Sequence, residues 1–414
     1  MTITLRPHQD RILDRMLAYN KGQIIVPTGG GKTLTMIVDT QRRHDVVKNG
    51  TTTVVVAPRI LLAEQLCSEF LEVVDTFNTH IMHVHSGETQ HFSTTKADQI
   101  HIFASVARTA GENVIIFTTY HSLHRLMEAD IEVNTIYFDE AHNSVQRNFF
   151  PATEFFANDA DRCYFYTATP KHSLTVSKPG MNDGAVYGQV LVNVPAPELV
   201  KQGYILPPKV VVKQLPMIKG RKVVFADDCD NLIETIDDNS IDKTLICART
   251  TKQIINLLTH SDFCLQLKER GYSWMTITSK TGAIIDGKKV NRDVFFDTLN
   301  TWGKDKTKKF VVLHHSILSE GINVPGLTHT ILLRNLPVIE MAQTIGRVIR
   351  LHKDDAQDIA EGKIIPGDLV NYRKSHGVVT VPLCGKASQA TRNRLQKVIE
   401  LIFVDGLPAH SFAN

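Results

Sequence analysis

The sequence lacks several features that would place the chain in a specialised class. No apolar run approaches the roughly 18–20 residues of a membrane-spanning helix, and the N-terminal segment MTITLRPHQD lacks a signal-peptide pattern. None of the six cysteines forms a C-x-x-C pair, which disfavours a zinc ribbon, and no repeat or low-complexity tract is present. We therefore expect a cytoplasmic protein, or one in the host cytoplasm if a phage encodes it, with reduced thiols and no membrane partner.

A strong excess of charge is also missing. The formal net charge of +3 neither demands nor excludes a nucleic-acid partner, because a local basic groove can bind a phosphate backbone. The length of 414 residues predicts roughly two to three domains. The 43% share of hydrophobic residues is typical of soluble globular proteins with real cores.

Short apolar segments alternate with amphipathic ones along the first half of the chain. The apolar segments are rich in Val, Ile, Tyr and Phe and end at polar or Gly/Pro positions, as strands do. The predicted strands are 22–26, 52–58, 113–119, 134–140 and 162–169. Their nearly continuous hydrophobicity is typical of a parallel sheet covered on both faces. With helical patterns at 59–74 and 122–129, this half predicts a doubly wound α/β domain.

A second alternating region follows a glycine- and proline-rich segment at 171–210. Its predicted strands are 243–248, 273–279, 308–315 and 329–335, and its predicted helices are 251–271 and 388–406. We divide the chain into domain 1 (1–200), domain 2 (201–385) and a C-terminal helix and tail (386–414). Each of the two domains is expected to be a mostly parallel sheet flanked by helices.

A glycine-rich stretch, PTGGGKT at 27–33, lies between a predicted strand and a predicted helix. Backbone N–H groups at such a helix start bind anions, and glycine lets the backbone approach phosphates closely. In this pattern Lys32 reaches the β- and γ-phosphates and the Thr33 hydroxyl ligates Mg²⁺. Val26 stands where the strict pattern has glycine, so the match is partial. The predicted ATP-binding residues here are Thr28, Gly29, Gly30, Gly31, Lys32 and Thr33.

Two carboxylates end the predicted strand at 134–140, at the edge where open α/β sheets bind their ligands. Asp139 is placed to hold Mg²⁺, and Glu140 is placed to polarise the attacking water as a general base. The glycine-rich loop alone predicts only the binding of a nucleoside triphosphate. The acidic pair adds the prediction that the nucleotide is hydrolysed.

The order PTGGGKT, DEAH (139–142) and TATP (167–170) resembles the core of the superfamily 2 helicases that carry a DEAH box. The resemblance covers about residues 3–352. It is strongest to the group of type III restriction subunits, XPB-like and RadD-like helicases and phage branch-migration helicases. It implies two tandem RecA-like domains that bind ATP between them and nucleic acid across both. It also implies that His142, Thr167 and Thr169 couple the acidic pair to domain 2.

The resemblance assigns further contacts to the adenine and to the nucleic acid. In LRPHQ (5–9), the Gln9 amide would pair with the adenine edge and Arg6 would pack over the ring. The stretches 57–65 and 117–123 resemble motifs that contact the nucleic-acid backbone. The residues assigned to nucleic acid are Pro58, Arg59, Thr118, Thr119 and Ser279.

Two motifs of the second half complete the resemblance. SILSEGINVPGL (316–327) would supply Glu320 for coupling and Gly321 and Asn323 for the nucleotide, although the family usually has Asp at the position of Asn323. QTIGRVIR (343–350) matches Q-x-x-G-R-x-x-R. It would supply Gln343, Arg347 and Arg350 as catalytic residues, with the two arginines one helical turn apart and acting on the γ-phosphate as arginine fingers.

Other constellations carry less weight. His83 and His85 would share one face of a strand, but no acidic or cysteine partner accompanies them, so a metal site is disfavoured. By resemblance, His85 would lie near nucleic acid. The basic runs 219–222, 303–310 and 382–394 are more typical of solvated loops than of nucleic-acid contacts.

The sequence thus predicts an ATPase that uses Mg²⁺ and is stimulated by nucleic acid. We expect a DNA helicase, with 3′-to-5′ polarity as the relatives imply, that acts on single-stranded or forked DNA in replication, recombination or repair and is monomeric on its own. A duplex-DNA translocase or branch remodeller, an RNA helicase and an ATP-gated nucleic-acid clamp remain open. No extra domain is evident as a strand-separating wedge, and no residue is dedicated to the RNA 2′-hydroxyl.

Overall fold

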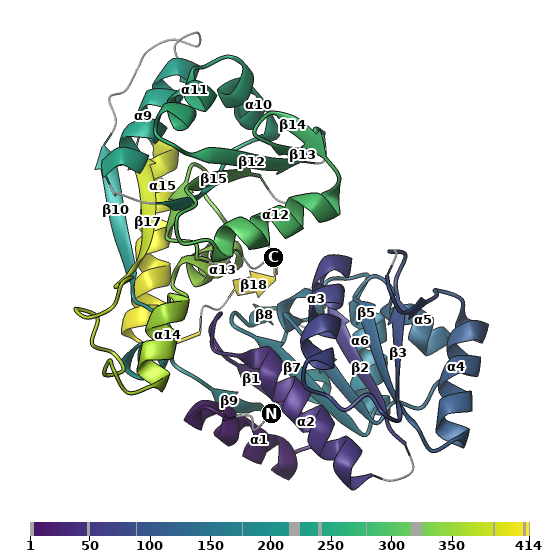
Figure 1. Ribbon diagram of the computed structural model, residues 1–414. Helices are drawn as coiled ribbons and strands as arrows, with labels where there is room; N and C mark the ends of the chain where they lie inside the picture. The colour runs from purple at the N-terminus through teal and green to yellow at the C-terminus, as the bar shows by residue number, and fades with distance from the viewer. Residues whose placement is uncertain are drawn as a thin grey trace. The chain divides into compact units, whose positions relative to one another are not determined.

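The computed structural model describes residues 4–47, 50–87, 89–175, 177–214, 224–238, 242–278, 280–315, 324, 326–383, 386–408 and 411–413. The chain forms two compact units, one of Met1–Val194 with Pro408–Asn414 and the other of Pro195–Leu407 (Figure 1). Each unit is a mostly parallel sheet flanked by helices, so the predicted fold class is confirmed.

The first unit contains an eight-stranded sheet in the order β4-β3-β5-β2-β6-β7-β1-β9. The strands are β1 (Lys21–Ile25), β2 (Thr52–Ala57), β3 (Thr79–Val84), β4 (Phe92–Ser93), β5 (Asn113–Thr119), β6 (Thr135–Phe138), β7 (Arg162–Thr167) and β9 (Val190–Asn193). All neighbouring strands pair in parallel. The carboxyl ends of the strands therefore lie along one edge of the sheet, where ligand sites of open α/β sheets form.

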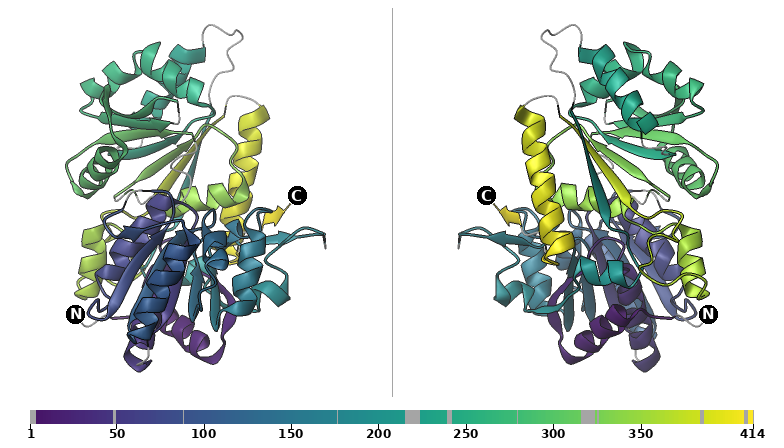
Figure 2. Two further views of the ribbon diagram at one scale, coloured as in Figure 1. Left: turned by 90° about the vertical axis from the view of Figure 1, so that its right-hand side faces the viewer. Right: turned by 90° about the vertical axis from the view of Figure 1, so that its left-hand side faces the viewer.

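Helices cover both faces of this sheet (Figure 1), and Figure 2 shows the arrangement from two sides. One layer comprises α1 (Pro7–Ala18), α2 (Lys32–Val46) and α3 (Ile60–Leu71). The other comprises α4 (Ala97–Thr109), α5 (Leu123–Glu128), α6 (Phe150–Asp159) and α7 (Gly184–Tyr187). A continuous apolar core joins α4–α7 to the sheet and includes the fully buried rings of Phe138, Phe156 and Phe165. A 3₁₀ turn, η1 (Ala141–Asn143), follows β6, and a short parallel pair joins β8 (Lys171–Ser173) to β18 (Ser411–Ala413).

The second unit contains an eight-stranded sheet in the order β10-β17-β16-β11-β15-β12-β13-β14. The strands are β10 (Pro208–Gln214), β11 (Lys243–Cys247), β12 (Ser273–Thr278), β13 (Gly282–Ile285), β14 (Lys288–Val290), β15 (Phe310–His314), β16 (His329–Leu332) and β17 (Gly377–Leu383). Only β12–β13 and β13–β14 pair antiparallel among these described strands. The hairpin therefore extends an otherwise parallel sheet.

The second unit also contains helices, several of which pack on its sheet. They are α8 (Ala196–Lys201), α9 (Val224–Asp238), α10 (Thr251–Thr259), α11 (Phe263–Glu269), α12 (Arg292–Lys304), α13 (Val338–Val348), α14 (Lys353–Ala360) and α15 (Lys386–Ile399), which a π-helical turn, η2 (Glu400–Val404), extends. Residues of α9, α10 and α11 form one apolar core with β11, β15 and β16. The long yellow helix α15 packs on β17 and α13 (Figure 2).

Most predicted strands appear with boundaries within two or three residues, but some elements differ from the prediction. The segment 251–271 is two helices rather than one, because Ser261 Oγ donates to the Leu257 carbonyl and accepts from the Phe263 N–H at the break. The segment 171–210, predicted as a break in the pattern, contains β8, α7, β9, α8 and the start of β10. Across the described residues no helix is both long and apolar enough to span a bilayer.

Candidate active site

The glycine-rich loop joins β1 to α2 in a shape that suits an anion. Gly29 and Gly31 have left-handed φ values of 86° and 81°. Gly31 is the N-cap of the 15-residue helix α2 and makes no side-chain cap hydrogen bond. As a glycine, the cap residue offers no side-chain acceptor to the first N–H groups of α2, which carry the positive end of the helix dipole. These residues fit a phosphate group.

The first turn of α1 holds the other side of this loop. Its three hydrogen bonds run from Arg6 Nη1 to Gly29 O (3.5 Å), from His8 Nε2 to Gly30 O (2.7 Å) and from Gln9 Nε2 to Gly31 O (3.1 Å). Three successive loop carbonyls are thus bound from α1. Arg6 and Gln9 are the residues that the resemblance assigns to the adenine. His8 was not predicted, and its only sequence signal is its place within LRPHQ.

Gln9 has further protein contacts in this structure. Its Oε1 accepts from the Arg6 backbone N–H at 2.9 Å, and the residue is 1% exposed. The amide predicted for adenine therefore supports the turn and the glycine-rich loop here. A Cβ on Gly31 would lie 2.5 Å from Gln9 Nε2, so the contact requires glycine at that position.

Lys32 and the acidic pair lie together at the carboxyl ends of β1 and β6. Lys32 Nζ donates to the Val26 carbonyl at 3.4 Å and lies 4.0 Å from Glu140 Oε1. Asp139 and Glu140 are both buried. Burial raises the pKa of the Asp139 carboxyl to about 7; the Glu140 charge adds to this, and Lys32 opposes it.

The chemistry of the acidic pair also suits a metal ion. Glu140 Oε2 is buried without a hydrogen-bond partner among the described residues, and Asp139 is a buried carboxylate at the start of the same turn. Hard oxygen donors of this kind suit Mg²⁺, which usually takes one or two carboxylates with substrate phosphates. The carboxylates of Asp139 and Glu140 therefore offer donors that fit a magnesium ion.

His142 and Thr167 are brought together by the fold. His142 Nδ1 is hydrogen-bonded to Thr167 Oγ1 at 3.1 Å, and the Thr169 N–H donates to the same oxygen at 3.1 Å. The Thr167 carbonyl accepts from the Val26 N–H at 3.0 Å. The turn after β6, the end of β7 and the strand before the glycine-rich loop are thus linked by hydrogen bonds.

The end of β5 carries two threonines predicted to contact nucleic acid, and both are buried. Thr118 is fully buried, and its hydroxyl donates to the Val84 carbonyl at 2.9 Å. Thr119 is 3% exposed. Pro58 is buried and Arg59 half-buried at the start of α3. The Thr118 hydroxyl is therefore committed inside the sheet, while Ser279 lies outside the described residues.

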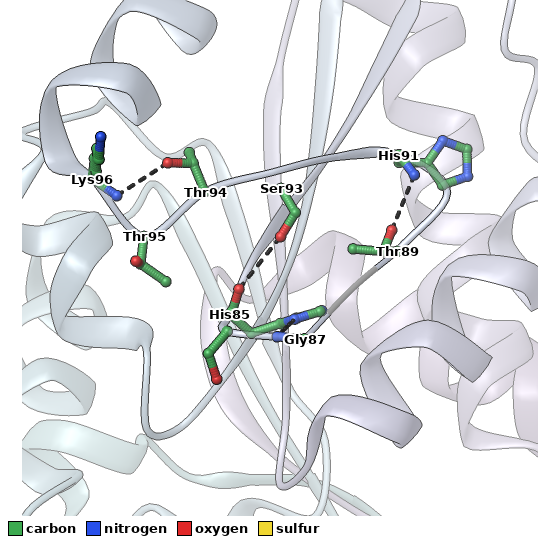
Figure 3. A pocket seen from close by; sticks show the side chains of 9 residues that line it. His85, Gly87, Thr89, His91, Ser93, Thr94, Thr95 and Lys96 are labelled. Atoms are coloured by element: carbon green, nitrogen blue, oxygen red, sulfur yellow. Dashed lines mark hydrogen bonds between the residues drawn. The ribbon is translucent and has the colours of Figure 1, made fainter. Parts of the chain in front are cut away.

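A polar pocket of about 680 Å³ lies beside the ends of β3 and β4 (Figure 3). It is lined by His85, Ser86, Gly87, Thr89, His91, Ser93, Thr94, Thr95 and Lys96, and none of these described residues carries a carboxylate. His85 Nε2 is hydrogen-bonded to His83 Nδ1 at 3.0 Å. Burial lowers the pKa of His83 to about 4 and lowers that of His85, so both are neutral at neutral pH. Lys96 is the one lysine or arginine among the described lining residues.

The second unit carries the predicted arginines on and after α13. Gln343 and Arg347 are both buried on this helix. Both amide atoms of Gln343 lack a hydrogen-bond partner among the described residues, and a buried amide in that state is unusual. Arg350 lies beyond the end of α13, and its backbone pairs with Ile205. Glu320, Gly321 and Asn323 lie outside the described residues.

Residues 2–172 match the family described as "Type III restriction enzyme, res subunit", which covers less than half of the chain. No curated protein matches the sequence. Among solved structures, the ATP-dependent Type ISP restriction-modification enzyme LlaBIII bound to DNA is similar, with a TM-score of 0.71 and 16% identity over 97% of this chain. The chain spans only 30% of the length of that enzyme.

Two smaller structures resemble the chain along most of their length. Saccharomyces cerevisiae Dbp5 L327V bound to RNA and ADP BeF3 has a TM-score of 0.59 and 15% identity, covering 98% of this chain and 88% of Dbp5. The Pyrococcus furiosus Hef helicase domain has a TM-score of 0.53 and 13% identity, covering 95% of this chain and 98% of Hef. The fold is that of tandem RecA-like helicase domains.

Proposed function

We propose that this chain is a nucleic-acid-stimulated ATPase that works as a DNA helicase. The observation that carries the proposal is the placement of Lys32 4.0 Å from Glu140, beside the uncapped start of α2. This combines a phosphate-binding helix start with a buried carboxylate that can accept a proton. The match of residues 2–172 to a restriction-subunit family supports it.

In this proposal each group of the first unit has a separate task. The N–H groups at the start of α2 and the Lys32 ammonium bind the phosphates of ATP. Thr33 and Asp139 would hold Mg²⁺, which supplies charge neutralisation at the phosphates. Glu140 accepts a proton from the attacking water. Its Oε2 accepts no hydrogen bond from the described residues and lies 3.6 Å from His142 Nδ1.

The second unit's part in the reaction is proposed from the sequence motif. Arg347 and Arg350 would stabilise charge on the transferred phosphoryl group, and Gln343 would position the nucleophile or phosphate. The buried, unpartnered amide of Gln343 supports a ligand-binding role. Arg350→Ala should lower kcat and leave nucleotide affinity unchanged; an effect on KM alone would contradict its assignment.

The carboxyl edge of the first sheet is the proposed nucleic-acid surface. Arg59 at the start of α3 and Lys96 in the lining of the pocket are basic groups that suit phosphodiesters. LlaBIII was solved with DNA and Dbp5 with RNA, so both substrates are tested below. We favour DNA and 3′-to-5′ movement because the DEAH-bearing resemblance implies them.

The decisive experiment is an ATPase assay of the wild-type chain and of Lys32→Ala, Glu140→Gln and a surface control, Lys178→Ala. Each protein is measured without nucleic acid and with single-stranded, duplex and forked DNA and RNA, at two salt concentrations. We expect stimulation by single-stranded or forked DNA, weaker at high salt, and no turnover in the first two variants. Turnover retained by Lys32→Ala and Glu140→Gln would contradict the active-site assignment.

Strand displacement on substrates with either overhang separates the remaining possibilities. Displacement from a 3′ overhang alone supports the proposed helicase. Stimulation by duplex DNA without displacement indicates a translocase or branch remodeller, and stimulation by RNA indicates an RNA helicase. Binding that changes with ATP, without stimulated turnover, indicates an ATP-gated clamp.

A further inference from the structure

The backbone of Glu140 has a conformation that few non-glycine residues adopt. Its φ is 46° and its ψ is 52°, in the left-handed region. This geometry is strained and persists only where surrounding contacts enforce it. The direction of the Glu140 carboxylate therefore depends on the groups that hold the two peptides on either side of it.

Those groups can be identified. The Asp139 N–H donates to the Val56 carbonyl and the Asp139 carbonyl accepts from Tyr120 Oη, each at 2.9 Å. The Glu140 carbonyl accepts from both the backbone N–H and Nδ2 of Asn143, each at 3.0 Å. Hydrogen bonds thus fix both peptide groups that flank Glu140. Tyr120 provides the side-chain hydrogen bond to the peptide that precedes Glu140.

Tyr120 is itself rigidly placed. It directly follows β5, its N–H donates to the Ala57 carbonyl at 3.1 Å, and only 2% of the residue is exposed. Its ring lies 6.1 Å from that of Phe138 and 5.7 Å from that of Phe149.

The end of β5 also contacts the segment that leads into the polar pocket. Thr118, two residues before Tyr120, donates its hydroxyl to the carbonyl of Val84, and Val84 immediately precedes His85 of the pocket. The end of β5 is therefore hydrogen-bonded to the pocket segment on one side and to the turn that carries Glu140 on the other.

We propose that Tyr120 is a positioning residue that fixes the backbone of Glu140 and so sets the direction of its carboxylate for activating water. The role rests on the proposed ATPase function. It also links the catalytic carboxylate to the strand end that lies beside the proposed nucleic-acid surface. Tyr120 touches neither Lys32 nor the glycine-rich loop in any contact that the structure gives, so its loss should leave nucleotide binding unchanged.

The test is Tyr120→Phe, which removes only the hydroxyl and keeps the packed ring. The matched control is Tyr164→Phe, because the Tyr164 hydroxyl also donates to backbone carbonyls, those of Met16 at 2.7 Å and Tyr19 at 2.8 Å, at the far end of α1. Steady-state ATPase with saturating forked DNA is measured together with KM for ATP and the Kd for DNA. A fluorescent nucleotide analogue gives the concentration of folded sites, to which kcat is normalised.

We expect Tyr120→Phe to lower kcat by about tenfold or more, as a misplaced catalytic group does, with KM and the DNA Kd within about twofold of wild type. Tyr164→Phe should leave kcat unchanged. A normal kcat in Tyr120→Phe, an equal loss in Tyr164→Phe, or a change confined to KM overturns the assignment. Absence of ATP turnover in the wild-type protein defeats the proposed function itself, and the role of Tyr120 with it.

Discussion

Gly31 meets two requirements at once. Its φ of 81° lies in the left-handed region, and a Cβ there would lie 2.5 Å from Gln9 Nε2. A left-handed φ is common in turns. The steric requirement comes from α1, because Gln9 on this helix donates a hydrogen bond to the Gly31 carbonyl of the loop. The glycine therefore serves the contact between α1 and the loop as well as the turn itself.

Gly31→Ala should weaken nucleotide binding by about tenfold or more, which corresponds to about 1.4 kcal/mol, because the Cβ displaces the Gln9 amide or the loop. The control is Gly271→Ala, since Gly271 has a φ of 76° but no neighbouring atom within 4 Å of its Cβ position. That variant should lose about 1–2 kcal/mol of unfolding free energy from backbone strain and bind nucleotide normally. Fluorescent-nucleotide titration and urea denaturation measure the two effects, and equal losses of affinity would disprove the steric argument.

At the scale of secondary-structure elements, the Asp39 carboxylate links a helix to two strands. Asp39 on α2 accepts from Arg162 on β7 at 2.8 and 3.1 Å and from the Tyr137 hydroxyl on β6 at 2.6 Å. Arg162 also donates to the carbonyl of Met16 on α1. The ion pair is almost fully buried, with side-chain exposures of 6% and 3%. The helix that begins at the glycine-rich loop is therefore held against the strands that carry the acidic pair and Thr167.

Arg162→Met should lower the free energy of unfolding by about 3–5 kcal/mol, because it leaves the Asp39 carboxylate buried without its cation. The control is Arg125→Met, which removes an ion pair to Glu128 whose side chains are both 44% exposed. That loss should cost less than about 1 kcal/mol. Urea denaturation of both variants decides the question, and similar costs would show that the buried pair does not hold these elements together.

At the scale of the whole molecule, both units bury neutral histidines. Burial lowers the pKa of His44 and His83 in the first unit to about 4 and that of His329 in the second to about 3. These imidazoles protonate near pH 6.5 in the unfolded chain but not in the folded one, so the unfolded state binds more protons below that pH. The pKa of Asp139 is raised instead, so this one carboxyl makes the folded state bind more protons and opposes the effect of the histidines.

We therefore expect the melting temperature to fall as the pH decreases from about 6.5 to about 5. His329→Gln, which keeps a partner for the Thr380 hydroxyl, should reduce the dependence of the melting temperature on pH. His121→Gln is the control, since His121 is exposed and should leave this dependence unchanged. Circular dichroism melts at about pH 7.5, 6.5 and 5.5 measure it; a melting temperature that is constant or rises on acidification would contradict the expectation.

Much of the fold could be predicted because the relevant patterns are local. Strands such as β2 and β5 are continuous apolar runs that follow from burial on both faces, and their predicted and observed ranges nearly coincide. The strand β3, with the sequence THIMHV, is not among the predicted apolar strands because its polar residues interrupt the apolar pattern. The sequence indicates it only through the expectation that His83 and His85 share one face of a strand. The break between α10 and α11 depends on the hydrogen bonds of Ser261, which a periodic apolar pattern does not reveal.

The candidate site likewise combines features that local sequence patterns predict with contacts that only the tertiary structure creates. The sequence by itself determined which residue types could bind phosphate, hold Mg²⁺ and accept a proton, because PTGGGKT and DEAH keep these groups adjacent along the chain. Only the tertiary structure decided that Lys32 lies beside Glu140, that His8 binds the Gly30 carbonyl, and that the Thr118 hydroxyl is used inside the sheet. Such contacts join residues 22 to 108 positions apart, and only the packing of strands and helices against one another brings them within 4.0 Å of each other.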